Sequence, residues 1–117
     1  MAWSERQVGD AVLAEARGRI DLSNADAFRD DLSAAMAKAK TAVVLDLSGV
    51  DYISSAGLRS LMIVFKAAKA EGKTLALAAL QPLLTEIFTI SRFNLVFPVF
   101  DTVRAAFGKV APGAAPP

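Results

Sequence analysis

Two adjacent hydroxyls, those of Ser54 and Ser55, stand where an apolar run gives way to a helical pattern. Two carboxylates, Asp46 and Asp51, come shortly before them. A serine at a helix start can cap the helix, act as a nucleophile beside a base, or accept a phosphate, because helix N-termini tolerate anions. The two carboxylates could do acid–base work or cap turns. These residues are the first candidates for a functional site.

The composition removes most of the catalytic alternatives. The 117-residue chain contains neither cysteine nor histidine, which excludes disulfides, thiol nucleophiles, zinc sites built from those residues and a Ser-His-Asp triad. No lysine is close in sequence to activate either serine as a nucleophile. We expect no catalytic residue, no metal site and no cofactor. A small α/β enzyme that uses Asp46 and Asp51 is the alternative of another class.

The charge balance narrows the class of partner. The chain has 13 basic and 12 acidic residues, a formal net charge of +1 and 54% hydrophobic residues. This predicts a globular protein that binds no nucleic acid and does not insert into a membrane. The first ten residues lack the apolar segment of a signal peptide, so a cytoplasmic location is expected.

Strands and helices are predicted to alternate along the chain. Apolar patterns indicate strands over 11–20, 42–47, 74–80 and 95–100, with 6–8 as a hairpin partner of the first. We expect Asp46 and Asp51 beyond the C-terminal end of the third strand, where ligands collect in open α/β sheets. Pro98 suggests that the last strand is at a sheet edge.

Four helical patterns separate these strands. We expect Ser23 to cap the first helix, Gly72 to end the second after 56–70, Pro82 to open the third, and Asp101 and Gly108 to bound the last. The order β-β-α-β-α-β-α-β-α predicts a single α/β domain with a mixed sheet of about four or five strands and about four helices. The domain is expected to span 1–110, and the small-residue, Pro-rich stretch 111–117 to be a disordered tail.

Three segments together resemble one protein family. The stretch 43–61, "VVLDLSGVDYISSAGLRSL", is similar to the core pattern of the STAS domain family, an apolar strand with D-L-S-x-V and then D-S-[ST]-G-L. The stretches 18–32, "GRIDLSNADAFRDDL", and 90–107, "ISRFNLVFPVFDTVRAAF", resemble its first helix and its C-terminal strand and helix. The likeness is greatest to the small stand-alone anti-sigma factor antagonists, also called anti-anti-sigma factors. A glycine usual before the last strand is replaced by Arg92 or Phe93, which should affect turn geometry.

The resemblance implies a role for single residues. Ser55 falls on the serine that the family's partner kinase phosphorylates, and Asp46 on an acid that helps shape that site. Asp21 falls on the loop acid of the same surface. Ser54 replaces the acid that usually precedes the phosphorylated serine, and Ala56 replaces the usual Ser or Thr after it, which leaves Ser54 as an alternative acceptor.

The resemblance also implies a bacterial partner switch that controls transcription. The unmodified protein would bind an anti-sigma factor that is also a serine kinase of the histidine-kinase-like ATPase fold, and so release a sigma factor. Phosphorylation of Ser55 would end that binding and a PP2C-type phosphatase would restore it, with the chain as substrate and not as enzyme. The residues expected to contact the partner are Asp21, Asp46, Asp51, Ser54, Ala56, Gly57, Leu58, Arg59 and Met62.

The switch has a physical basis in the charges expected around Ser55. A phosphate adds about −1.5 to −2 charges and would stand near three aspartates, so repulsion should weaken binding with little refolding. The alternative within the family is a non-switching subunit that docks on a transporter ATPase, in which Ser55 would serve only as a helix cap.

Overall fold

The computed structural model describes residues 1–113, and these form an alternating α/β domain. The predicted order of elements is confirmed, with five strands and four α-helices in the described part of the chain. The strands are β1 (Ala2–Val8), β2 (Ala11–Ile20), β3 (Ala42–Ile53), β4 (Thr74–Ala78) and β5 (Val99–Phe100). The helices are α1 (Ala25–Lys38), α2 (Ser55–Ala70), α3 (Pro82–Ile90) and α4 (Val103–Val110), with a 3-10 turn, η1 (Phe93–Leu95). Residues 114–117 of the expected tail lie outside the described residues.

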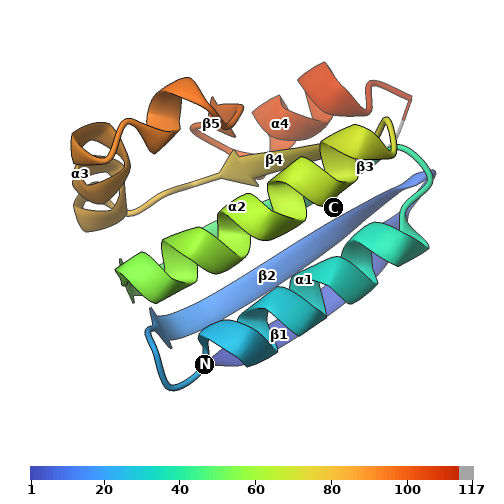
Figure 1. The fold of residues 1–117 in the computed structure, drawn as a ribbon. Coiled ribbons are helices and arrows are strands. Elements are labelled where there is room, and N and C mark those ends of the chain that lie inside the picture. The colour runs from blue at the N-terminus through green and yellow to red at the C-terminus, as the bar shows by residue number, and fades with distance from the viewer. Residues whose placement is uncertain (114–117) are drawn as a thin grey trace.

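The strands form one mixed sheet in sequence order, β1-β2-β3-β4-β5 (Figure 1). β1 runs antiparallel to β2, and the two-residue turn between them contains Gly9 with a φ of 60°, a conformation that glycine adopts without strain. The other neighbouring strands are parallel, so each is reached through a helical crossover. The carboxyl ends of β2 and β3 therefore lie at the same edge of the sheet.

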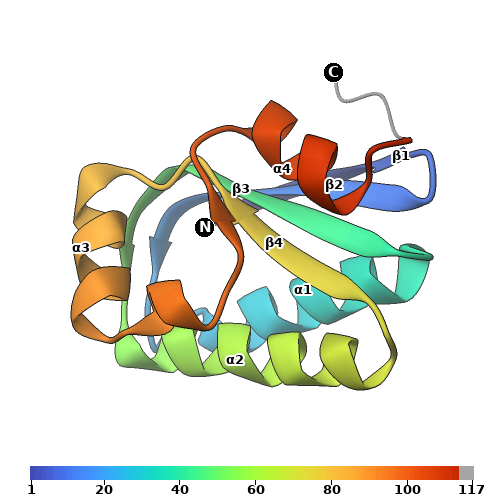
Figure 2. The ribbon, with the colours of Figure 1, turned by 90° about the horizontal axis from the view of Figure 1, so that it is seen from above.

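Helices cover both faces of the sheet. Figure 2 shows α1 and α2 side by side on one face and α4 on the other, with α3 at the end where α2 begins. The main core lies under α1 and α2, where Phe28, Leu32, Leu61 and Val64 meet the inward side chains of the strands. A smaller core lies under α4, around Phe107.

β3 is longer than predicted. It runs to Ile53, so the expectation that it ends near residue 47 and leaves Asp46 and Asp51 beyond it is wrong. The cause is two β-bulges, at each of which β3 carries one residue more than β2. The register partners on either side of these shifts are Glu15 with Asp46, Arg17 with Gly49, Gly18 with Val50, and Arg19 with Tyr52. The bulges change the spacing of the inward residues Leu47, Val50 and Ile53 to three, which does not match a regular strand.

The first helix begins differently from the prediction. Asn24, and not Ser23, is the N-cap position of α1, and no side-chain hydrogen bond caps the helix there. Ser23 is engaged elsewhere, because its hydroxyl donates to Asp21 Oδ1 at 2.6 Å. The Asn24 amide instead closes the loop, donating to the carbonyl oxygen of Arg19 at 2.8 Å.

The C-terminal part also departs from the prediction. Of the region expected as one strand over 95–100, only Val99 and Phe100 form a strand, while Leu95 is the last residue of η1. This short β5 is the sheet edge that Pro98 suggested. Arg92, before η1, has a φ of 63°, a left-handed conformation that favours glycine. Thr102, not Asp101, caps α4 by accepting from the Ala105 N–H at 3.0 Å, and α4 continues past Gly108 to Val110.

Candidate functional site

The two serines have different structural roles. Ser54 is the N-cap of α2, and its Oγ accepts a hydrogen bond from the Gly57 N–H at 3.2 Å. The N–H of Ser54 donates to the carbonyl of Ile20 at 2.9 Å, which ties the helix start to the end of β2. Ser55 is the first residue of α2 and is exposed, and within residues 1–113 its hydroxyl has no hydrogen-bond partner. Only the Ser55 hydroxyl is therefore free of a structural role.

Two of the residues expected at the partner surface face the core. Gly57 is buried, and a Cβ there would come within 2.7 Å of Ile53 Cγ1 and 2.8 Å of Ile20 Cγ2. Packing inside the chain therefore explains this glycine, rather than the approach of a partner. Leu58 and Met62 were expected at the partner contact, with at least one of them facing inward. Leu58 is the one that does, since it is 9% exposed and belongs to the main core, while Met62 is half-buried against that core.

Ser55 instead lies in a groove between α1 and α2. The groove has a volume of about 580 Å³ and is lined by Leu22, Ala25, Asp26, Arg29, Ser55, Ala56, Arg59, Ser60 and Ile63. Ser55, Arg59 and Ile63 follow one another at intervals of four and so share one face of α2. The buried Ser60 hydroxyl donates to the Ala25 carbonyl at 2.9 Å and joins the two walls. We call this feature the α1–α2 groove.

Sequence reasoning missed two apolar side chains of this groove. Leu22 is 84% exposed at the start of the α1 wall, and Ile63 is 46% exposed on the α2 wall. On α2, Leu61 and Val64 take the inward positions and leave Ile63 on the outer side of the helix. The only sequence feature that could have pointed to Leu22 as a contact residue is that it is apolar within a polar loop. Exposed apolar side chains beside one groove are typical of a contact surface.

The groove also carries two guanidinium groups. On α1, Arg29 lies 3.7 Å from Asp26 and 3.8 Å from Asp30, two long and exposed pairs that contribute little stability. On α2, Arg59 is exposed and has no carboxylate within 4.0 Å among the described residues. The walls around Ser55 therefore hold two positive groups and one negative group.

Asp21 borders the serines through the contact of Ile20 with Ser54. Its carboxylate accepts from the Ser23 hydroxyl at 2.6 Å, from the Ser23 N–H at 3.0 Å and from Arg19 Nε at 3.0 Å. The Ser23 hydrogen bonds, and then Arg19, lower the pKa of Asp21 below its usual 3.8. Asp21 is therefore a charged residue with a fixed orientation at neutral pH.

The other two predicted acids lie at different distances from the serines. Asp51 is exposed and stands at the second bulge of β3, near the helix start. Asp46 pairs with Glu15 and Ala78 in mid-sheet and accepts from the Ser48 N–H at 2.9 Å. Seven residues of β3 separate Asp46 from Ser54, and two of them are taken up by the bulges, so the separation is roughly 20 Å at the rise of a strand. The structure does not bring Asp46 to the serines.

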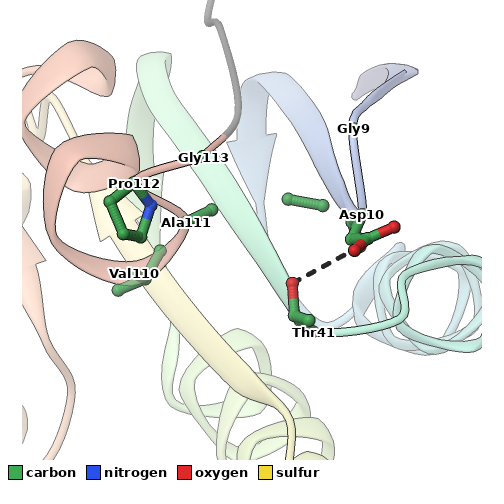
Figure 3. Close-up of a pocket in the computed structure, with 8 residues that line it drawn as sticks. Gly9, Asp10, Thr41, Val110, Ala111, Pro112 and Gly113 are labelled. Atoms are coloured by element: carbon green, nitrogen blue, oxygen red, sulfur yellow. Dashed lines mark hydrogen bonds between the residues drawn. The ribbon is translucent and has the colours of Figure 1, made fainter.

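A second cavity lies at the opposite end of the domain. It has a volume of about 380 Å³ and is lined by the β1–β2 turn, the residue before β3 and the end of α4 (Figure 3). Its polar groups include the Asp10 carboxylate and the Thr41 hydroxyl, which donates to the Asp10 carbonyl at 3.5 Å. Residues 1–113 contain no cluster of three potential metal-ligating acids, and none of their helices has the length and apolar character to span a membrane.

Comparison with known proteins places the chain in a family. The family model for the STAS domain matches residues 2–106, and the chain belongs to this family. The chain is 37% identical over 100 residues to the putative anti-sigma factor antagonist BtrV of Bordetella bronchiseptica, covering 86% of each. It is 28% identical over 109 residues to the putative anti-anti-sigma factor Rv2638 of Mycobacterium tuberculosis, covering 92% of this chain and 74% of that one.

Solved structures share the fold. A putative anti-sigma factor antagonist from Thermotoga maritima superposes with a TM-score of 0.85 at 20% identity, over 92% of this chain and 93% of that one. The Bacillus cell fate determinant SpoIIAA in its phosphorylated form gives a TM-score of 0.70 at 18% identity, over 93% and 99%. The family assignment made from the three sequence segments is confirmed.

Proposed function

We propose that this chain is an anti-sigma factor antagonist whose unmodified form binds an anti-sigma factor with serine kinase activity, and that phosphorylation of Ser55 ends this binding. The observation that carries the proposal is the exposed Ser55 hydroxyl, without a partner within residues 1–113, at the mouth of the α1–α2 groove. The name of the 37% identical relative BtrV, a putative anti-sigma factor antagonist, supports the class of partner.

The hydrogen bonds favour Ser55 over Ser54 as the acceptor. Phosphate on Ser54 Oγ would compete with the cap to Gly57 and would cost helix stability. Phosphate on Ser55 leaves that cap in place and meets the unpaired N–H groups of the first turn, which favour an anion. In the transfer, Ser55 Oγ bonds to the γ-phosphorus of ATP, the bond to ADP breaks, and the hydroxyl proton passes to a base of the kinase. The chain is the substrate of this reaction and also of a PP2C-type phosphatase, which hydrolyses the phosphoserine ester with water, restores the hydroxyl and releases inorganic phosphate.

The partner surface that we propose is centred on the α1–α2 groove. Leu22 and Ile63 provide apolar contact, and Ala56 and Arg59 line the same groove as Ser55. Asp21 contributes a fixed negative charge at the edge of this surface. A phosphate dianion on Ser55, within this surface, would reduce the free energy of partner binding by about 3 kcal/mol or more, which corresponds to a loss of affinity above a hundredfold.

The test uses the cognate kinase, ATP and mass spectrometry on intact protein. The unmodified chain and Ser54→Ala should each gain one phosphate, and Ser55→Ala should gain none. Binding of the kinase should weaken at least a hundredfold for Ser55→Asp, and Leu22→Ala with Ile63→Ala should weaken it without changing the fold. Phosphorylation of Ser55→Ala at the unmodified rate would refute the site. Recovery of a transporter ATPase in place of the kinase would refute the class of partner.

A further inference from the structure

Arg59 is the charged side chain best placed to meet a group attached to Ser55. The two residues are four apart on α2, a spacing that puts their Cβ atoms about 5–6 Å from each other on one face. Both line the α1–α2 groove, and Arg59 is exposed with no carboxylate within 4.0 Å among the described residues. Its guanidinium is therefore free to turn toward Ser55 without breaking an ion pair.

Arg29 approaches the same space from the opposite wall. Its contacts with Asp26 and Asp30 are 3.7 Å and 3.8 Å long, and both carboxylates are largely exposed. Such pairs contribute little, so a stronger acceptor in the groove can take one of its N–H donors. The hydrogen bond of Ser60 to Ala25 keeps the two walls together and so keeps both arginines within one groove.

We propose that Arg59, assisted by Arg29, binds the phosphate of modified Ser55, so that the phosphorylated chain fills its own docking groove. The inference rests on the proposed function for the modification of Ser55, and it adds how the modification acts. Guanidinium groups bind phosphate through paired, charge-assisted hydrogen bonds. The phosphate then removes Arg59 from the partner and occupies the space between Leu22 and Ile63. The phosphate thus prevents partner binding in two ways: it occupies the α1–α2 groove of its own chain, and it repels negative charge.

We call the binding of the phosphate by Arg59 and Arg29 the clamp. Acidic groups near Ser55 act against the clamp, and both effects change the second pKa of the phosphate, which can be measured. Asp26 lies in the groove with an 88% exposed side chain, while Asp21 and Asp51 lie at the ends of β2 and β3. These acids raise the second pKa of a phosphate on Ser55, whereas Arg59 and Arg29 lower it. Removing an acid should therefore lower this pKa and removing an arginine should raise it, and the largest rise identifies the arginine that binds the phosphate.

The experiment places phosphoserine at position 55 during synthesis, so that no kinase is needed. The second pKa of this phosphate is followed by phosphorus NMR between pH 4 and pH 9 in the full chain. Arg59→Gln should raise that pKa by about 0.5 or more, Arg29→Gln by less, and Asp26→Asn should lower it. Arg59→Lys, which keeps the charge but loses the paired donors, should fall between Arg59→Gln and the parent chain.

Lys66→Gln is the matched control. It removes one positive charge from the same helix, about 16 Å from Ser55 along the helix axis, and should leave the phosphate pKa unchanged. An equal pKa in Arg59→Gln and Lys66→Gln would overturn the clamp, even if the kinase modifies Ser55. Conversely, a raised pKa in Arg59→Gln would stand even if the kinase were found to modify another residue, so failure of the clamp is distinguishable from failure of the proposed function.

Discussion

Ser54 Oγ accepts the N–H of Gly57 at 3.2 Å, and this single contact separates the functions of two neighbouring serines. One hydroxyl holds the first turn of α2, and the next along the chain faces the groove without a hydrogen bond within residues 1–113. The Ser55 hydroxyl is therefore available for modification, while the Ser54 hydroxyl stabilises the start of α2.

Removing the cap should cost stability, whereas removing its neighbour should not. We expect Ser54→Ala to lower the free energy of unfolding by about 1 kcal/mol, because the Gly57 N–H loses its acceptor, and Ser54→Asp to retain most of it. Ser55→Ala should change it by less than about 0.5 kcal/mol. Urea denaturation followed by circular dichroism measures both. Equal losses at the two positions would contradict the division of roles.

Gly57→Ala should destabilise the chain through overpacking. The new methyl group would lie 2.7 Å from Ile53 Cγ1 and 2.8 Å from Ile20 Cγ2, so we expect a loss of about 1–3 kcal/mol in the free energy of unfolding. Gly108→Ala is the control, because it is also helical but its methyl group would meet nothing within 4 Å. There we expect a gain of up to about 1 kcal/mol. The same sign for both variants in a urea titration would refute the packing argument.

Arg92→Gly should stabilise the chain. Arg92 holds a φ of 63°, which costs a non-glycine residue about 1 kcal/mol or more, and glycine relieves that cost at some expense in chain entropy. We expect a net gain of about 0.5–1 kcal/mol, seen as a higher melting temperature. Ser91→Gly, at the neighbouring residue with a φ of −80°, should instead lower it. A loss in Arg92→Gly would show that the arginine side chain contributes more than its backbone costs.

The Asp21 carboxylate should make stability depend on acid. Its hydrogen bonds with Ser23, followed by Arg19, lower its folded pKa below the usual 3.8, so it binds its proton less readily when folded. Its stabilising contribution is therefore complete above pH 3.8 and is lost as the pH falls through the folded pKa. Carbon-detected NMR of the Asp21 carboxyl should show this lowered value. In Ser23→Ala it should move back toward 3.8, and an unchanged value would refute the cause.

The order of elements was predictable because most of them bury one regular stripe. In α1, Phe28 and Leu32 repeat at helical spacing, and in β2 the small apolar residues alternate with charged ones. The length of β3 was not predictable from period alone, since its bulges shift the inward residues Leu47, Val50 and Ile53 out of alternation. The expectation that Asp46 lies beside Asp21, Asp51 and the serines failed for the same reason, because it placed a turn where the strand continues.

The serine pair was found from the sequence, but the groove that it faces was not. Position on a helix suggests which residues are near one another, yet whether Ile63 or Val64 faces inward depends on how α2 packs against α1 and the sheet. Likewise the choice of Asn24 over Ser23 at the start of α1 depends on Asp21 taking the Ser23 hydroxyl. Competing local hydrogen bonds of similar strength are decided only by the folded geometry.

Because β3 carries two residues more than β2, the geometry of this site depends on the number of residues in β3 as well as on their side chains. Deleting Asp51 would remove one bulge, draw the start of α2 back by about 3.3 Å and turn the end of the strand to its other face. Ile53 would leave the core and the serines would turn away from the groove. The stretch from Leu47 to Gly57 can therefore accept exchanged side chains. Adding or deleting one residue in it would instead change the orientation of every side chain that follows, up to the start of α2.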